Sequence, residues 1–141
     1  MPSPGERTDK SGRGSASPLI LVVEDDPGVR RLVRSMLRSC KYRVLEAANG
    51  SEGLAQLTRH RDSIELVVSD VVMPDINGPE LAARMKAMGS EAPVLFMSGY
   101  ADRTLLSRGL TDGTMRVLRK PFTLAQLSER VTELLDSHGG R

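Results

Sequence analysis

Asp70 is the residue whose position in this chain most clearly suggests chemistry. It ends an apolar run that begins at Ile64 and is rich in β-branched residues, which is typical of a strand buried on both faces. A carboxylate at the carboxyl end of such a strand would stand at the rim of a parallel sheet, where open α/β folds bind their ligands. An isolated aspartate at this position is more often a turn former or a helix cap, so the interpretation depends on other residues.

Polar side chains of complementary charge also follow three other predicted strands: Glu24, Asp25 and Asp26 after the first, Ser98 at the end of the fourth, and Lys120 after the fifth. We expect them to lie near Asp70, because the carboxyl ends of parallel strands share one edge of the sheet. Converging carboxylates repel one another, and a hard cation such as Mg²⁺ would offset that repulsion. With an ammonium and a hydroxyl beside them, such carboxylates suit phosphoryl transfer onto an aspartate.

A structural interpretation of the same residues is that the acids cap helices, Lys120 forms an ion pair and Ser98 is incidental. For any one residue this interpretation is favoured. For four strand ends together the functional one is favoured, because convergent charges cluster at functional sites.

The apolar pattern predicts five short strands that alternate with helices. The strands are expected at 19–23, 42–47, 64–70, 93–98 and 115–119. Helices are expected at 27–40, 51–60, 79–88 and from 123 onward, with a short or frayed helix within 101–112. Short strands separated by helices imply right-handed crossovers, so the expected fold class is α/β, a doubly wound five-stranded parallel sheet with helices on both faces.

Local signals support these helix boundaries. Asp26 is a plausible N-cap with Pro27 at the first helical position, and Thr123 forms a capping box with Gln126. Two apolar helix faces are predicted to be buried. They consist of Val29, Leu32, Val33, Met36, Leu37 and Cys40 in the first helix, and of Leu124, Leu127, Val131, Leu134 and Leu135 in the last.

Length and composition bound the class of protein. The chain has 141 residues, of which 39% are hydrophobic and 27% charged, as expected for one globular domain. Residues 1–18 contain ten Ser, Pro or Gly residues and are predicted to be a disordered tail or linker, followed by a domain at 19–137 and a tail at 138–141. A single cysteine excludes an intramolecular disulfide. No run approaches the length of a membrane span, and the basic residues are too dispersed to predict nucleic-acid binding.

The motifs together identify a family that the chain resembles. Four stretches carry the resemblance: Val22 to Asp26, Ser69 to Gly78 with its Met73-Pro74 pair, Met97-Ser98-Gly99, and Arg119 to Phe122. They resemble, in order and spacing, the receiver domain of bacterial two-component response regulators, over about residues 18–137. The resemblance implies a flavodoxin-like sheet with strand order 2-1-3-4-5 and a cis peptide bond between Lys120 and Pro121.

The resemblance also implies roles for the matching residues. Asp70 would accept a phosphoryl group from a phosphohistidine of a histidine kinase or a histidine phosphotransfer domain. Asp25, Asp70 and the backbone carbonyl of Val72 would bind Mg²⁺ directly, and Glu24 would act through a metal-bound water. Ser98 would hydrogen-bond the phosphoryl group, and Lys120 would pair with the acids and then with a phosphoryl oxygen.

The chain departs from the family pattern at one position. Families of this kind often place Tyr or Phe three residues before the lysine, where this chain has Val117, so the usual aromatic readout is not expected. Tyr100, two residues after Ser98, is hypothesised to overhang the site and slow attack by water; the alternative is a solvent-exposed loop aromatic.

Basic residues of the first helix allow two interpretations. Arg30, Arg31, Arg34 and Arg38 form either a solvated face or a docking surface for the phosphodonor, because partners of this family approach beside that helix.

Other functions are less compatible with the residues. A haloacid-dehalogenase-type phosphohydrolase needs a second aspartate two residues after the first, where this chain has Val72. A receiver-like scaffold without phosphotransfer would not need the complete set of acids, hydroxyl and lysine. The expected protein is a cytoplasmic signalling module that catalyses only its own phosphorylation and dephosphorylation. Its partner kinase, output and oligomeric state, and whether it stands alone or belongs to a hybrid kinase, are left open.

Overall fold

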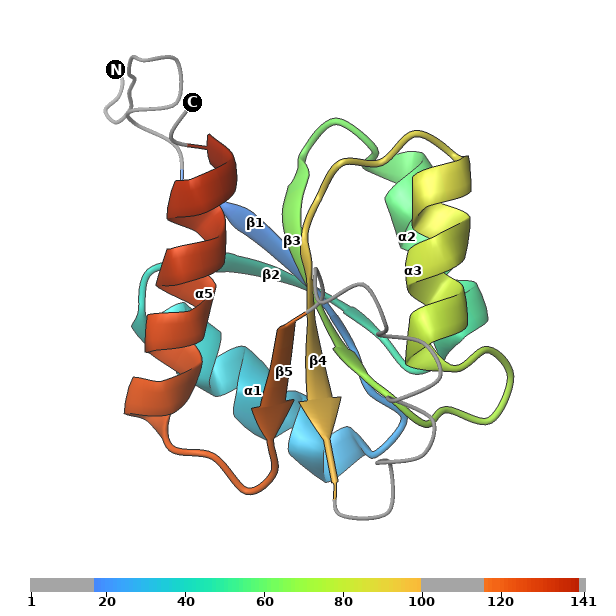
Figure 1. The fold of residues 1–141 in the computed structure, drawn as a ribbon. Coiled ribbons are helices and arrows are strands. Elements are labelled where there is room, and N and C mark those ends of the chain that lie inside the picture. The colour runs from blue at the N-terminus through green and yellow to red at the C-terminus, as the bar shows by residue number, and fades with distance from the viewer. Residues whose placement is uncertain (1–16, 100–115, 140–141) are drawn as a thin grey trace.

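A five-stranded parallel sheet forms the centre of the molecule (Figure 1). The computed structural model describes residues 17–99 and 116–139. The strands lie in the order β2-β1-β3-β4-β5, which confirms the predicted order. Their bounds are β1 Leu19–Val23, β2 Arg43–Ala47, β3 Ile64–Asp70, β4 Val94–Ser98 and β5 Arg116–Arg119. Because every pairing is parallel, all five strands end at the same edge of the sheet.

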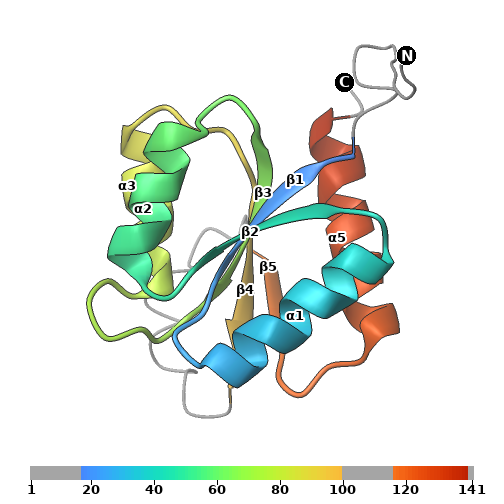
Figure 2. The same cartoon turned by 180° about the vertical axis from the view of Figure 1, so that it is seen from behind.

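Helices cover both faces of this sheet. The described helices are α1 Pro27–Ser39, α2 Gly50–Arg59, α3 Gly78–Ala87 and α5 Leu124–Gly139. Helices α1 and α5 lie on one face, and α2 and α3 on the other, as Figures 1 and 2 show from opposite sides. The doubly wound α/β architecture is therefore confirmed. The helix predicted within 101–112 lies outside the described residues.

Side-chain caps determine where the helices begin. The carboxylate of Asp26 accepts hydrogen bonds from the backbone N–H groups of Gly28, at 2.8 Å, and Val29, at 3.2 Å. Thr123 and Gln126 form the predicted reciprocal box, with distances of 2.9 and 3.1 Å. Asn49 caps α2 by accepting from the Glu52 backbone N–H, so that helix begins at Gly50, one residue before its predicted start. The cis Lys120–Pro121 bond is also present.

The core consists of two apolar layers, one on each face of the sheet. The layer beneath α1 and α5 includes Val33, Leu37, Leu127 and Val131, as the helix patterns predicted. Three predictions about these faces are wrong. Leu32 is 55% exposed and Leu124 is 43% exposed. Cys40, predicted to be in the core, is only half-buried at the C-cap of α1.

Leu32 and Leu124 are exposed because of where their helices meet the sheet. Consecutive helical residues are separated by roughly 100° around the axis, so Leu32 points well away from the neighbouring Val33, which contacts the core. Leu124 is the first residue of α5, where the helix has only begun to cross the sheet.

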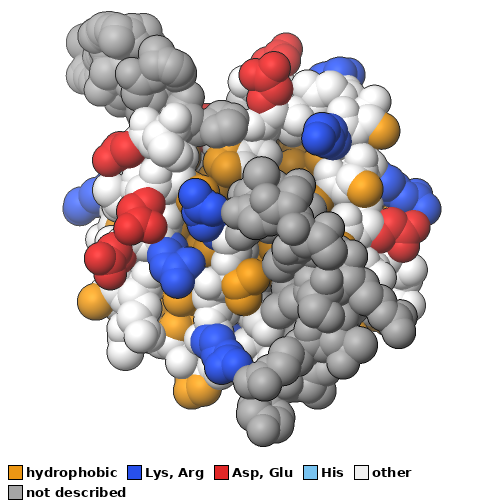
Figure 3. All heavy atoms as spheres, in the orientation of Figure 1, with side chains coloured by type: hydrophobic (Ala, Val, Ile, Leu, Met, Phe, Trp, Pro, Cys, Tyr) orange, Lys and Arg blue, Asp and Glu red, His pale blue; other side chains and the backbone are white. Residues whose placement is uncertain are grey.

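The surface of the described residues carries mixed charges. Acidic and basic side chains are interspersed over the face that Figure 3 presents. Among residues 17–99 and 116–139, no helix has the length and apolar character that crossing a membrane requires. The predicted tails at 1–18 and 138–141 remain predictions, since the structure describes only small parts of them.

Candidate functional site

Acidic side chains from two neighbouring strands meet at the carboxyl edge of the sheet. Glu24 and Asp25 directly follow β1, and Asp70 is the last residue of β3, the next strand in the sheet. One carboxylate oxygen from each residue lies within 4.8 Å of those from the other two. Glu24 and Asp70 are buried, whereas Asp25 is exposed. Solvent therefore reaches the cluster from the side of Asp25.

This cluster fits a hard divalent cation. Carboxylate oxygens are preferred ligands of Mg²⁺, which commonly binds through one or two carboxylates and retains several waters. An exposed Asp25 leaves room for such waters, while the buried pair supplies concentrated negative charge. Val72, whose carbonyl was predicted to be a further ligand, lies two residues beyond Asp70 with an exposed side chain.

Lys120 joins the two buried acids. Its ammonium nitrogen Nζ lies 3.1 Å from Glu24 Oε1 and 3.2 Å from Asp70 Oδ1. Its backbone N–H donates to the carbonyl of Ser98, at 2.8 Å, which ties the ends of β4 and β5 together. The pairing of Lys120 with the acids, predicted by resemblance, is present in this structure. Removing Lys120 would leave both acids without their counter-charge and is expected to be strongly destabilising.

Burial and mutual repulsion make the acidic cluster hard to ionise fully. Burial raises the pKa of Glu24 to about 7; the nearby charge of Asp70 adds to the shift, and a hydrogen bond from the Asp26 backbone together with Lys120 opposes it. Burial also raises the pKa of Asp70, although Lys120 opposes the change. Burial alone would lower the pKa of Lys120, but the two carboxylates outweigh it and raise that pKa. Without a bound cation the site would carry unfavourable negative charge.

Ser98 completes the set at the end of β4. Its side chain is 3% exposed, and its hydroxyl donates to the carbonyl of Gly99, at 3.1 Å. In this arrangement the hydroxyl bonds the chain's own backbone, and its predicted bond to a phosphoryl group stays a prediction. Tyr100 lies outside the described residues. Val117 is half-exposed, and its carbonyl accepts a hydrogen bond from Arg130 Nη1 of α5, at 3.0 Å.

Gly78 lies directly against the backbone of Asp70, a contact that the sequence did not predict. Its N–H donates to the carbonyl of Val71, at 2.7 Å. A Cβ atom at this glycine would lie 2.7 Å from the Asp70 carbonyl oxygen and 2.8 Å from the ring of Phe96, a side chain that is completely buried. The first turn of α3 can therefore approach β3 this closely only without a side chain.

Asp75 anchors the segment that follows Asp70. Its carboxylate accepts hydrogen bonds from the backbone N–H groups of Gly50, at 3.0 Å, and Ser51, at 2.9 Å, at the start of α2. It also accepts one from the Ile76 N–H, at 2.7 Å. Hydrogen bonds from Ser51 and then from Ile76 and Gly50 hold the pKa of this carboxyl well below its usual range. A carboxylate is favoured at this place because a helix N-terminus offers unpaired N–H groups and a positive dipole end.

Comparison with known proteins agrees with this geometry. Residues 20–132 match the family model of the response regulator receiver domain. The chain therefore belongs to the response regulator receiver domain family, and the predicted resemblance is confirmed. It serves as a receiver domain of two-component systems.

The chain spans only part of the length of the curated relatives it matches. It is 35% identical over 131 residues to the sensor kinase CckA of Brucella abortus, covering 93% of this chain and 14% of that kinase. It is 34% identical over 126 residues to the transcriptional regulatory protein PrrA of Mycobacterium tuberculosis, covering 89% of this chain and 53% of that protein. The solved receiver domain of the hybrid histidine kinase CckA matches with a TM-score of 0.69 and 35% identity, over 83% of this chain and 98% of that one.

Proposed function

We propose that Asp70 accepts a phosphoryl group from a phosphohistidine and that Mg²⁺ assists this transfer. The observation that supports the proposal best is the convergence of Glu24, Asp25 and Asp70 around the ammonium of Lys120. In the proposed step a carboxylate oxygen of Asp70 attacks phosphorus, the P–N bond of the phosphohistidine breaks, and the imidazole leaves.

The chain's own residues would position and neutralise the reacting groups. Glu24 and Asp25, with Asp70 and the Val72 carbonyl, would hold the metal, which supplies positive charge for the phosphoryl oxygens. Lys120 would contact another of these oxygens as a point charge, since its ammonium is already beside Asp70. Ser98 would turn from the Gly99 carbonyl to the phosphoryl group and so couple phosphorylation to a change in surface.

Intact mass after incubation with Mg²⁺ and a small acyl phosphate tests this function. The wild-type chain should gain one phosphoryl group, because the small donor needs no docking surface. Asp70→Asn should gain none, since an amide cannot replace the carboxylate as nucleophile. Asp136→Asn is the matched control, because it makes the same change on an exposed position of α5 and should retain the gain. A gain in Asp70→Asn, or no gain in the wild type with any donor, would overturn the proposal.

The proposed partner is a histidine kinase or a histidine phosphotransfer domain that docks beside α1. The relative in Brucella abortus is named a sensor kinase, which agrees with such a partner. Arg30 and Arg34, two of the arginines predicted to form a solvated or docking face, form ion pairs with Glu46 of β2. Arg31 and Leu32 are exposed on the same helix and are the residues that we propose contact the partner. A cytoplasmic location is part of this proposal, because the phosphodonor domains act there.

Leu32→Ala should slow phosphorylation by the partner without affecting the small donor. Fully burying a leucine side chain contributes roughly 1.5–3 kcal/mol, and Leu32 is already partly buried, so a loss of about 1 kcal/mol, or roughly fivefold in kcat/KM, is expected. The measurement compares transfer from a phosphorylated histidine phosphotransfer domain with transfer from an acyl phosphate. Equal rates for variant and wild type with both donors would place docking elsewhere.

A further inference from the structure

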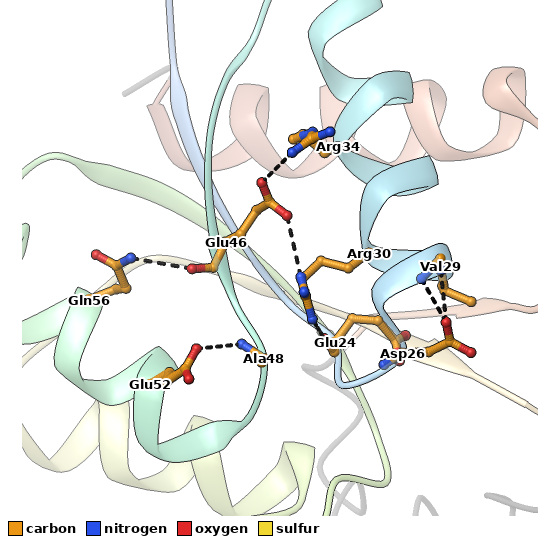
Figure 4. A network of polar contacts seen from close by, with 10 residues as sticks. Glu24, Asp26, Val29, Arg30, Arg34, Glu46, Ala48, Glu52 and Gln56 are labelled. Carbon is orange, nitrogen blue, oxygen red and sulfur yellow. Dashed lines mark hydrogen bonds and ion pairs between the residues drawn. The ribbon is translucent and has the colours of Figure 1, made fainter.

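The backbone that carries the acidic cluster is held by a side chain of α1. Arg30 Nη1 donates a hydrogen bond to the main-chain carbonyl of Glu24, at 2.8 Å. Figure 4 shows this guanidinium between Glu24 and Glu46, reaching across from the first turns of the helix. The contact joins residues six positions apart, over the turn in which Glu24 and Asp25 lie.

Glu24 is held at every polar group that the structure describes. Its N–H donates to the carbonyl of Ala47 on β2, at 3.0 Å, and its carbonyl accepts from Arg30. Its carboxylate accepts from Lys120 at Oε1 and from the backbone N–H of Asp26 at Oε2, each at 3.1 Å. The contact with Arg30 is the one among these that α1 contributes through a side chain, so it sets the position of the turn relative to that helix.

Arg30 is itself held in place by a carboxylate on the neighbouring strand. Its Nε lies 3.3 Å from Glu46 Oε1, and Arg34 Nη1 lies 2.8 Å from the other oxygen of the same carboxylate (Figure 4). These side chains are 21–29% exposed, so solvent screens the contacts less than on an open surface. Burial would raise the pKa of Glu46, but the hydrogen bonds and charges of Arg34 and Arg30 outweigh it and lower that pKa. Glu46 therefore stays ionised at neutral pH.

An arginine suits this task because its donors form a rigid planar fork. Nη1 reaches the carbonyl of Glu24, in the turn after β1, while Nε reaches a carboxylate of β2, so a single side chain connects α1 with that turn and with β2. A lysine has one nitrogen atom on a flexible stem and is less suited to bridging the two acceptors in a fixed geometry.

We propose that Arg30 is a positioning residue of the divalent-cation site, acting through the main-chain carbonyl of Glu24. By fixing the turn after β1, it keeps the carboxylates of Glu24 and Asp25 directed toward Asp70. Glu46 orients Arg30, and Arg34 balances the charge of Glu46 without touching the turn. This inference rests on the proposed Mg²⁺ site, and it assigns to this chain's first helix a role in metal affinity.

Arg30→Met and Arg34→Met test the inference as a matched pair. Both variants remove one arginine from Glu46, but only the first removes the donor to the Glu24 carbonyl. Mg²⁺ affinity is measured directly by calorimetric titration of the unphosphorylated protein, and the free energy of unfolding is measured in the absence of metal. Residues that orient metal ligands typically change affinity by tenfold or more, so Arg30→Met should weaken Mg²⁺ binding about tenfold. Arg34→Met should bind Mg²⁺ as the wild type does.

Arg30→Lys separates positioning from a general effect on folding. It keeps the charge and one donor, so it should recover part of the affinity that Arg30→Met loses, while remaining folded at the temperature of the titration. Equal Mg²⁺ affinities in the wild type, Arg30→Met and Arg34→Met would show that Arg30 is structural only and would overturn the inference alone. Absence of Mg²⁺ binding by the wild type would instead overturn the proposed metal site and this inference with it.

Discussion

Gly78→Ala should lower the free energy of unfolding by roughly 2–3 kcal/mol, because a Cβ atom at this position has no space. It would lie 2.7 Å from the Asp70 carbonyl oxygen and 2.8 Å from the Phe96 ring. Neither neighbour can yield easily, since one is strand backbone and the other is a completely buried aromatic side chain. The substitution therefore has to displace β3 at its last residue or move α3 away from the sheet.

The same displacement should affect the proposed phosphorylation site. Moving the backbone of Asp70 moves its carboxylate relative to Lys120, so the rate of phosphorylation by an acyl phosphate should fall together with stability. Urea unfolding and intact mass measure the two effects. Gly28→Ala is the matched control, because its Cβ would meet only the exposed carboxylate of Asp26, at 3.3 Å. If Gly78→Ala were as stable as the wild type, a Cβ atom at this position would not be in conflict with Asp70 and Phe96, and the prediction would be wrong.

Glu24→Gln should stabilise the metal-free domain at pH 8 while weakening its binding of Mg²⁺. A carboxyl group whose pKa is raised from 4.5 to about 7 binds its proton more tightly in the folded state than in the unfolded state. Stability therefore falls as pH rises from about 4.5 to about 7. Glutamine is neutral throughout and avoids this loss, and its amide oxygen can still accept one of the two hydrogen bonds. Allowing for the weakened contact with Lys120, the expected gain is roughly 1–2 kcal/mol.

The pH dependence and the metal distinguish this effect from ordinary stabilisation. In urea unfolding with a chelator, the advantage of Glu24→Gln should disappear by about pH 4.5, where the wild-type carboxyl is protonated in both states. With Mg²⁺ present the wild type should regain stability through binding.

Glu46→Gln is a control variant whose stability at pH 8 should change in the opposite direction. The pKa of Glu46 is lowered, so its contribution to stability is present above its unfolded pKa and is lost as pH falls through its folded pKa. This variant should be less stable than the wild type at pH 8. A Glu24→Gln protein that is also less stable at pH 8 would show that the ion pair with Lys120 outweighs the cost of burying the acid.

Most of the fold could be predicted because local and long-range signals agree. The β-branched run before Asp70 formed β3 with the predicted bounds, Ile64–Asp70, and the capping residues Asp26 and Thr123 began their helices where expected. The convergence of Glu24, Asp25 and Asp70 followed from one property, namely that all parallel strands end at the same edge. The strand order itself came from the resemblance, since alternating elements alone allow several orders.

Contacts that depend on register between distant segments could not be predicted. Four arginines on α1 were expected to form a solvated or docking face, but two of them pair with Glu46, whose side chain faces α1 because of the pairing of β2 with β1. Gly78 entered the sequence analysis only as the end of a stretch that carries the family resemblance, because the reason for a glycine there includes a buried ring 18 positions away.

The anchoring of Asp75 at the start of α2 has a consequence for changes in chain length. The segment between β2 and α2, residues 48–49, must bring Gly50 and Ser51 to a carboxylate that belongs to the connection after β3. Inserting or deleting one residue there would rotate both N–H groups away, and the loop that follows Asp70 would lose its attachment although no residue of that loop had changed. The length of the connection between β2 and α2 is thus set by the loop that follows β3.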